Sequence, residues 1–228
     1  MIIAAYFITG SLHLLLGIFP YVVKRNRANL FFMFANISLC LWVLFVYLAW
    51  NHYHHTLWAR LSFSAIFSYV TLMMLFTLHF PVKLVTFTKK ILFSVQVPNI
   101  LVFFLSFTPH IFISFDPYLK KSAYGPLYLP FVIITLAFVL IIFIVFARQY
   151  IKLKGYDRLR FFYFLLGWGL SGITIIVTNV ILPLLGTSKY NQIGPLSTLF
   201  VTGLLTYSIV KHRLLDIKII ISRSLASI

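Results

Sequence analysis

Residues 194–223 read GPLSTLFVTGLLTYSIVKHRLLDIKIIISR, and this stretch decides the fold. The opening Gly-Pro suits the first turn of a helix, where the amide proton that proline lacks would have no partner anyway. Residues 196–210 carry no charge, and a basic run then begins at Lys211. Helices that leave a bilayer on its cytoplasmic side end in this way. The stretch therefore predicts a last membrane span that continues directly into a cytoplasmic connector.

The composition of the whole chain also indicates a membrane protein. Of its 228 residues 61% are hydrophobic and only 10% are charged, which is typical of a multi-span membrane protein. One span needs about 20 apolar residues. Working outward from the last span, seven segments qualify: residues 2–23, 30–50, 61–80, 91–108, 127–146, 161–185 and 195–210. We expect an all-α bundle of seven transmembrane helices, with a membrane domain over residues 1–210 and the connector over 211–228.

The positions of the basic residues predict the orientation of this bundle. Fifteen of the 19 Lys and Arg residues fall in the loops after the first, third, fifth and seventh spans, and four fall on the other side. The cytoplasmic side carries the excess of positive charge in membrane proteins. We therefore expect the N-terminus outside, the C-terminus inside and a multi-pass location in the cell membrane. The net charge of +16 then needs no nucleic-acid partner.

The acidic residues exclude several kinds of chemistry. Asp116, Asp157 and Asp216 all lie outside the predicted spans, so no buried carboxylate is available to relay protons or bind cations. No span contains Lys, which excludes a retinal Schiff base. The chain has no Gly-rich phosphate loop, zinc-ligand spacing or nucleophile elbow. We expect no enzymatic activity, no cofactor and no metal.

Two groups of histidines remain as candidates. His13 is the one titratable residue well inside a span, where it suits either a pH-sensing or ligand-binding role, or a neutral histidine hydrogen-bonded within the bundle; the second is favoured. His52, His54 and His55 cluster in a short loop. They suit a metal or a sensor of external acidity, but no carboxylate or cysteine is close in sequence, and a solvated loop is favoured.

The outer halves of the last two predicted spans suggest a ligand site. Pro183 cannot donate to the carbonyl of Asn179, which leaves an acceptor in lipid unless something satisfies it. Thr198 and Thr202 lie one turn apart on one face of the last helix. We predict that a small apolar or amphipathic ligand enters from outside and binds between these two helices. The alternatives are a simple helix bend at Pro183 and threonine hydroxyls bonded to their own helix.

The end of the last span also carries a family resemblance. Tyr207-Ser-Ile-Val-Lys-His-Arg213-Leu-Leu-Asp216-Ile217 is similar to the close of the seven-span membrane region found at the N-terminus of many bacterial sensor histidine kinases. The Asn179-x-x-x-Pro183 and Gly194-Pro195 steps match as well. The resemblance implies a membrane-embedded sensing module of a two-component system. The residues expected to transmit the signal are Tyr207, Lys211, Arg213, Leu214, Asp216 and Ile217.

No kinase part is recognisable in these 228 residues, so any kinase activity would lie elsewhere. The chain is expected to be either a fragment or a stand-alone receptor, acting as a homodimer or with a separate cytoplasmic output protein. The alternative function is a small-solute carrier with a three-plus-one-plus-three arrangement of helices, although we see no internal repeat to support it.

Overall fold

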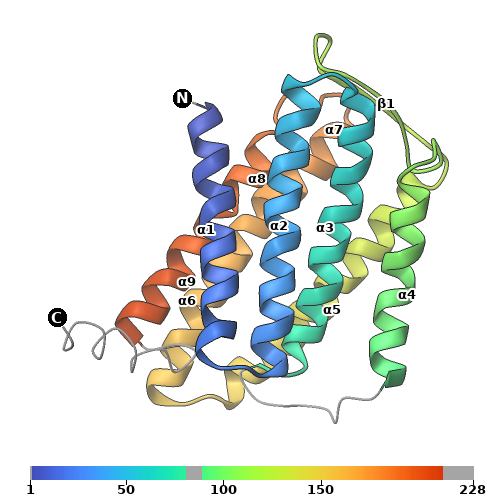
Figure 1. Cartoon of the computed structure of the whole chain (residues 1–228). Helices are drawn as coiled ribbons and strands as arrows, with labels where there is room; N and C mark the ends of the chain where they lie inside the picture. Colours follow the sequence, from blue (N-terminus) through green and yellow to red (C-terminus); the bar gives the residue numbers. More distant parts are fainter. Residues whose placement is uncertain (1, 81–88, 213–228) are drawn as a thin grey trace.

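The computed structural model describes residues 2–80 and 89–212 and is mostly helical (Figure 1). Four helices come first and are followed by a β-hairpin and then by the remaining helices. The elements are α1 (Ile2–Val23), α2 (Arg27–Asn51), α3 (His55–Thr77), α4 (Lys89–Leu105), β1 (Phe112–Asp116), β2 (Lys121–Tyr124), α5 (Tyr128–Lys152), α6 (Gly155–Ile176), the π-helical turn η1 (Val177–Ile181), α7 (Leu182–Leu184), α8 (Ile193–Ser197) and α9 (Leu199–His212).

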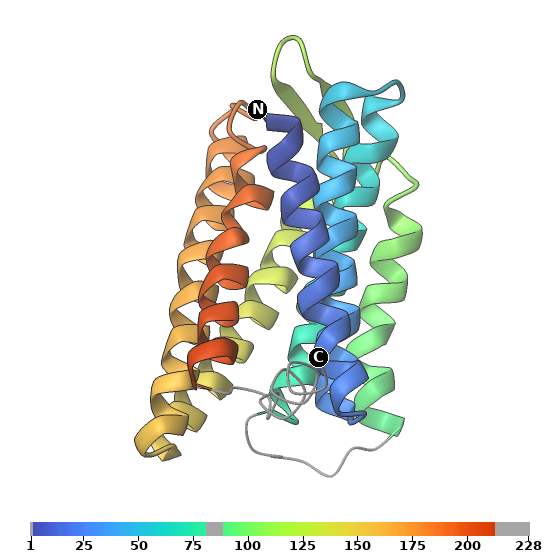
Figure 2. The same cartoon turned by 60° about the vertical axis from the view of Figure 1, so that its left-hand side comes forward.

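The helices form two groups. In the first group α2 packs closely against α1 and α3, and α3 also packs against α4 and α5. In the second group α6 packs along α9 and against α8. Figure 2 shows α6 and α9 as a pair beside the row formed by the first helices. Contacts between the two groups are much sparser than those within each group, so the seam between them is the natural place for a cavity or a movement.

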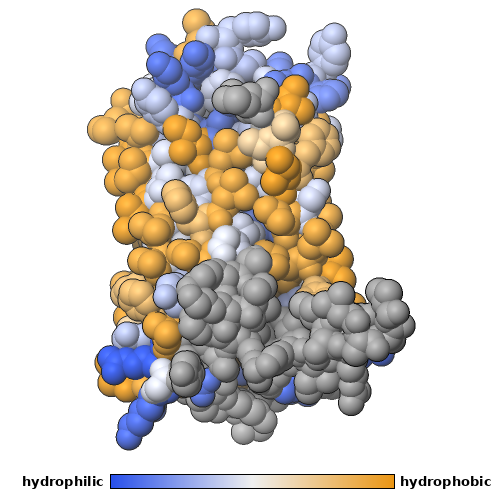
Figure 3. Space-filling model, turned by 90° about the vertical axis from the view of Figure 1, so that its left-hand side faces the viewer, coloured by the Kyte–Doolittle hydropathy of each residue, from blue (hydrophilic) through white to orange (hydrophobic). Residues whose placement is uncertain are grey.

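Each of the seven predicted spans overlaps one or more helices. Among the described residues, five helices are long and apolar enough to cross a membrane: Ile3–Val23, Arg27–Asn51, His55–Thr77, Tyr128–Lys152 and Asp157–Leu184. The predicted fourth and seventh spans correspond to the shorter apolar helices Lys90–Leu105 and Ile193–Leu205. On the face in Figure 3 a hydrophobic band lies between hydrophilic ends. The chain is thus a multi-pass membrane protein built from helices.

The burial of the fifth and sixth predicted spans in the bundle differs from what their sequences predict. The sixth predicted span is rich in small residues, which predicts a central helix, but α2 and α3 bury far larger shares of their residues than α6 does. The almost entirely apolar fifth span predicts a helix at the lipid-facing rim, and this holds for one face only. Ile133 and Leu140 on α5 are exposed, whereas Ile142 and Phe146 are fully buried.

The prediction of an all-α fold misses the hairpin of β1 and β2. The strands are antiparallel and pair Phe112 with Tyr124 and Asp116 with Lys121. The register shifts between Phe112 and Ser114, and this irregularity lets Phe112 and Phe115, three positions apart, both be buried. A regular strand would alternate with period two. The bulge therefore hides the strand pattern from a search of the sequence.

Arg60 holds the hairpin on the end of α3. Its Nε donates to the carbonyl of Phe112 at 2.8 Å, and its Nη2 donates to the carbonyl of Ile113 at 2.9 Å. Phe112 and Phe115 pack below, with ring centroids 5.2 Å from Phe63 and 5.0 Å from Trp50 respectively. The hairpin is thereby fixed as a cover over one end of the bundle (Figure 1).

Candidate functional site

A cavity lies inside the bundle, between the two helix groups and beneath the hairpin. It leaves about 170 Å³ for the centres of water-sized molecules. Residues of α2, α3, α5, α6 and α9 form its walls, and Phe112, Phe115 and Tyr124 of the hairpin lie at one end. Most of the lining side chains are aliphatic or aromatic. Cavities of this character suit apolar small molecules held by a few polar groups.

The hairpin ties the covered end of the cavity to both groups. The ring of Tyr124 stacks on Tyr128 at the start of α5, with centroids 3.9 Å apart. Ser122 and Ser188 place their hydroxyl oxygens 2.8 Å apart, and the Ser188 amide donates to the carbonyl of Lys120. Burial raises the pKa of the Tyr124 phenol. Tyr124 therefore stays a neutral hydrogen-bonding group at neutral pH.

One hydrogen bond crosses the seam at the cavity wall. Trp168 on α6 donates from Nε1 to the hydroxyl oxygen of Tyr69 on α3 at 3.0 Å, and both side chains are buried. Within the part of the chain that the structure describes, no group accepts the hydroxyl proton of Tyr69. Asn191 also lines the cavity, and its buried Oδ1 has no partner among those same residues. The cavity thus offers polar groups with unused hydrogen-bonding capacity.

His13 forms a second bridge across the seam. Its Nδ1 lies 3.2 Å from Oδ1 of Asn36 on α2, and its Nε2 lies 2.8 Å from Oγ1 of Thr198. Asn36 donates from Nδ2 to the carbonyl of Phe32, so its Oδ1 is the acceptor that faces His13. A neutral His13 then carries its proton on Nδ1 and accepts from Thr198 at Nε2. This is the hydrogen-bonded position within the bundle that the sequence favours.

The neighbourhood of Asn179 differs from the predicted kink. The chain accommodates Pro183 through the π-helical turn η1, in which the Leu182 amide donates to the carbonyl of Val177 five residues back. The Asn179 side chain donates to the carbonyl of Asn191 at 3.1 Å and accepts from Thr178 at 2.7 Å. Asn179 therefore joins α6 to the loop before α8. Single π-helical turns occur often at functional sites.

The structure brings together three of the five predicted ligand-binding residues. Asn179 and Thr198 line the cavity, and His13 is hydrogen-bonded to Thr198. Pro183 and Thr202 are not among the lining residues, and the hydroxyl of Thr202 bonds to the carbonyls of Thr198 and Leu199 in its own turn. Sequence reasoning missed Asn36, although a lone amide in an apolar span gives the same signal as His13.

The structure describes the loop histidines and part of the predicted connector. His55 directs Nδ1 to the carbonyl of Ala49 at 2.8 Å. Over residues 2–80 and 89–212, no three His, Cys, Asp or Glu side chains come together to hold a metal ion. Of the predicted connector, Tyr207 and Lys211 fall on the backbone of α9. The other four residues lie outside the described residues: Arg213, Leu214, Asp216 and Ile217.

Comparison with known proteins places the chain in a family. Neither the curated proteins nor the solved structures give a match. A family model, described as the N-terminal 7TM region of histidine kinase, matches residues 5–218. The match spans nearly the whole chain and includes every helix that lines the cavity. This family is the membrane part that precedes the kinase. The chain therefore belongs to the N-terminal seven-transmembrane region family of histidine kinases.

Proposed function

We propose that this chain is the membrane-embedded sensor of a two-component histidine kinase and that its stimulus is a small apolar or amphipathic ligand bound in the cavity. The observation that carries the proposal is the position of this cavity, at the seam between two helix groups. The second group includes α9, which ends at His212 next to the basic residues of the connector. The chain itself is proposed to be no enzyme; it acts as a homodimer or together with a separate cytoplasmic output protein, and any kinase activity lies outside these residues.

The seam suits a receptor because few polar bridges hold it. His13 with Thr198 and Tyr69 with Trp168 join the two groups. Suppose that a ligand binds more tightly when the two helix groups are slightly displaced than when they are not. The ligand then shifts the population toward the displaced state, and the difference between its two affinities sets the size of the shift. The pair formed by α6 and α9 packs tightly and moves as one unit. The displacement then reaches the connector residues Tyr207, Lys211, Arg213, Leu214, Asp216 and Ile217.

Asn179, Pro183 and Thr202 belong to the moving side of this seam. The π-helical turn before Pro183 gives α6 an irregular outer end, and Asn179 ties that end to the loop before α8. Thr202 lies on α9, one turn after Thr198, which stands between α8 and α9. We assign the first two to the outer end of the ligand site and Thr202 to the transmission of the shift along α9.

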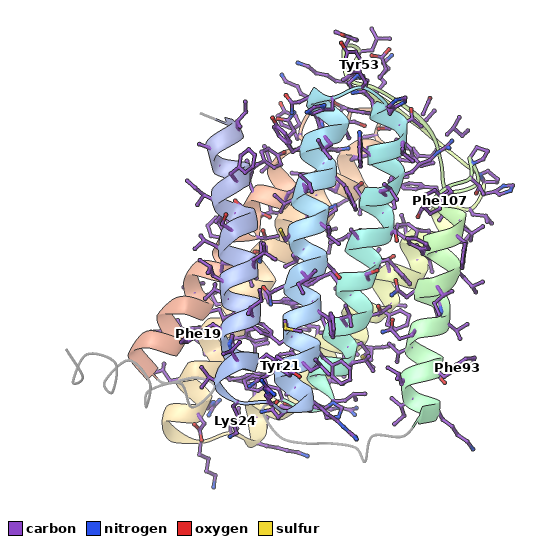
Figure 4. All side chains as sticks on the ribbon, viewed as in Figure 1. Phe19, Tyr21, Lys24, Tyr53, Phe93 and Phe107 are labelled. Carbon is purple, nitrogen blue, oxygen red and sulfur yellow. The ribbon has the colours of Figure 1, made fainter. Side chains whose placement is uncertain are left out.

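The proposed topology has seven crossings, with residues 1–210 as the sensor domain and 211–228 as the cytoplasmic connector. In Figure 4 Lys24 and Tyr53 mark opposite ends of the bundle. Lys24 belongs to the basic end, and the positive-inside rule assigns that end to the cytoplasm. The N-terminus lies toward the end of the bundle that carries Tyr53 (Figures 1 and 4), so it then faces outside.

A chimera tests the proposed function. A histidine kinase output is joined after Ile228, and basal autophosphorylation is measured in membranes. Asn179→Leu and Thr198→Val weaken contacts on the moving side, so we expect a change in the active fraction of about fivefold or more, equivalent to about 1 kcal/mol. Thr174→Val is the matched control, because the hydroxyl of Thr174 bonds only within its own helix, to the carbonyl of Leu170. Unchanged output in both seam variants would contradict a sensor role for this site.

A second measurement separates the sensor from the small-solute carrier. The purified chain is reconstituted in sealed vesicles, and the uptake of labelled amino acids and sugars is followed against protein-free vesicles. A sensor gives no accumulation beyond the lipid background. Saturable uptake that depends on the protein favours the carrier.

A further inference from the structure

We infer that the ligand of the cavity is an apolar molecule of one or two rings with a hydrogen-bond acceptor, which enters from the bilayer between α5 and α6 and accepts the hydroxyl proton of Tyr69. The inference rests on the proposed function, since it concerns the same cavity. It adds the chemical class of the ligand, the residue that selects it and its route of entry.

The hydroxyl of Tyr69 determines which polar group the ligand needs. Its side chain lines the cavity and is buried, with 9% of its surface exposed. The hydroxyl oxygen already accepts from Trp168, and its own proton has no acceptor among the described residues. A buried donor left without an acceptor destabilises the empty cavity. A ligand that places a carbonyl or ether oxygen against this hydroxyl recovers that cost, whereas a ligand that can only donate does not.

The side chains of the cavity walls determine the size and the apolar character of the ligand. Trp42, Phe131 and Val201 contribute apolar surface from three different helices, and the hydroxyl of Thr135 is already bonded to the carbonyl of Phe131. An apolar cavity of about 150 Å³ in another protein stays dry and binds benzene. The slightly larger volume here, about 170 Å³, takes one aromatic ring or a compact pair of rings.

The packing of α5 and α6 indicates the way in. These helices follow each other in the chain but make few contacts, while both line the cavity. Gly172 on α6 is a lining residue, and a Cβ built on it meets no atom within 4 Å. The hairpin covers the outer end, and its linkages to α3 and to Ser188 hold it there. Entry from lipid between α5 and α6 is therefore the open route.

A pair of probes and a pair of glycines test the inference. The full chain is placed in lipid nanodiscs, and the binding of tritiated 2-acetylnaphthalene and 2-isopropylnaphthalene is measured above that of empty nanodiscs. The two probes have nearly the same shape, and only the ketone has an acceptor. We expect Tyr69→Phe, compared in a Trp168→Phe background so that no freed Trp168 N–H replaces the lost donor, to weaken ketone binding about fivefold to tenfold, the value of one neutral hydrogen bond, and to leave the hydrocarbon unchanged.

The glycine variants test whether the probes occupy the cavity beside α6, next to the proposed route. Gly172→Leu places its Cβ in open space at the cavity wall, so we expect the protein to fold and to lose most binding of both probes. Gly169→Leu is the matched control, because a Cβ there also meets nothing within 4 Å but Gly169 does not line the cavity. Thermal unfolding confirms the fold of each variant. Ketone binding that Tyr69→Phe leaves unchanged overturns the inference, and so does equal binding by the Gly172→Leu and Gly169→Leu proteins.

These results are independent of the kinase output. If the probes bind in the expected pattern but the chimera does not respond to its seam variants, the inference stands and the proposed function fails. If the chimera responds to Asn179→Leu but neither probe binds, the proposed function stands and the inference fails.

Discussion

The hydroxyl of Thr198 shows how a single residue can make a weak point in a buried seam. It has one proton and two acceptors within reach, His13 Nε2 at 2.8 Å and the carbonyl of Pro195 at 2.6 Å. While the two helix groups are together, these two acceptors compete for the one Thr198 proton; when the groups separate, the proton can turn fully to the carbonyl of Pro195, so the hydroxyl keeps an acceptor. The contact therefore closes the seam at a modest net free energy, which is what the proposed receptor function needs of it.

The first prediction at this scale concerns that contact. Thr198→Val removes the hydroxyl and leaves a buried ring nitrogen of His13 without its partner. We expect the free energy of unfolding to fall by about 1–3 kcal/mol. The measurement is denaturant-induced unfolding in detergent micelles, with Thr174→Val as the control that should change it by less. In a double-mutant cycle, His13→Phe and Thr198→Val together should cost less than the sum of the two; strict additivity would mean that the pair does not interact.

The second prediction concerns Arg60. Arg60→Gln removes the charged donors to the carbonyls of Phe112 and Ile113, and such bonds are each worth about 1.5–3 kcal/mol. We expect faster amide hydrogen exchange over residues 112–124, with little change in α2. Lys120→Gln removes an exposed cation from the same hairpin and serves as the control. Equal exchange in both variants would show that Arg60 does not hold the hairpin.

At the scale of the element, α6 packs through one of its glycines only. A Cβ on Gly167 would lie 2.9 Å from the carbonyl oxygen of Phe200 and 3.0 Å from Cα of Val201, whereas one on Gly169 meets nothing within 4 Å. Small residues at such positions let membrane helices approach closely. The tight pairing of α6 with α9 thus depends on Gly167, and the two glycines behave differently although they are two positions apart.

This difference gives the third prediction. Gly167→Ala forces α6 away from α9 and should destabilise the protein by about 1–3 kcal/mol. Gly169→Ala gains helix propensity without a collision and should stabilise it by up to about 1 kcal/mol. Thermal unfolding of both proteins in the same detergent decides the matter. A loss of stability in Gly169→Ala as large as that in Gly167→Ala would contradict the close approach at position 167.

The elements also show what the sequence can predict. Long apolar runs with charged ends are sufficient for the helices, because lipid allows little other backbone structure. The hairpin could not be predicted in this way, since its bulge breaks the alternation and its stability depends on Arg60, 52 residues before Phe112. The π-helical turn was likewise hidden: Pro183 indicates an irregularity, but its form depends on the packing of Asn179 against Gly194.

The candidate site was predictable to the extent that its residues are unusual in lipid. His13, Asn179 and Thr198 stand out in apolar runs, and the structure gathers them around one seam. Tyr69 and Trp168 did not stand out, because aromatic side chains are common throughout this chain. The cavity itself is a product of sparse packing between helices far apart in sequence, which no local pattern encodes.

At the scale of the whole molecule, the cavity, the seam and the charged ends fit one direction of signalling. The hairpin and the first turn of α1 lie at one end (Figure 1), and the helix pair that borders the cavity extends to the other. Basic side chains such as Lys24, Arg25 and Lys154 belong to that second end. On the proposed function, a ligand in the cavity would act on the helix that leads to the basic end, so the orientation of the bundle would decide where the signal is delivered.

The fourth prediction tests this orientation. Cys40 is the only cysteine, so Cys40→Ser gives a thiol-free protein to which one cysteine is added at an exposed position: Tyr53→Cys at the hairpin end or Lys154→Cys at the basic end. Because the positive end remains in the cytoplasm, a membrane-impermeant maleimide should label Tyr53→Cys in intact cells and Lys154→Cys only after lysis. The thiol-free protein controls for background, and a cytoplasm-dependent reporter fused after Ile228 should be active. Labelling of Lys154→Cys in intact cells, with a silent reporter, would place the connector outside the cell, where it could not reach a cytoplasmic kinase.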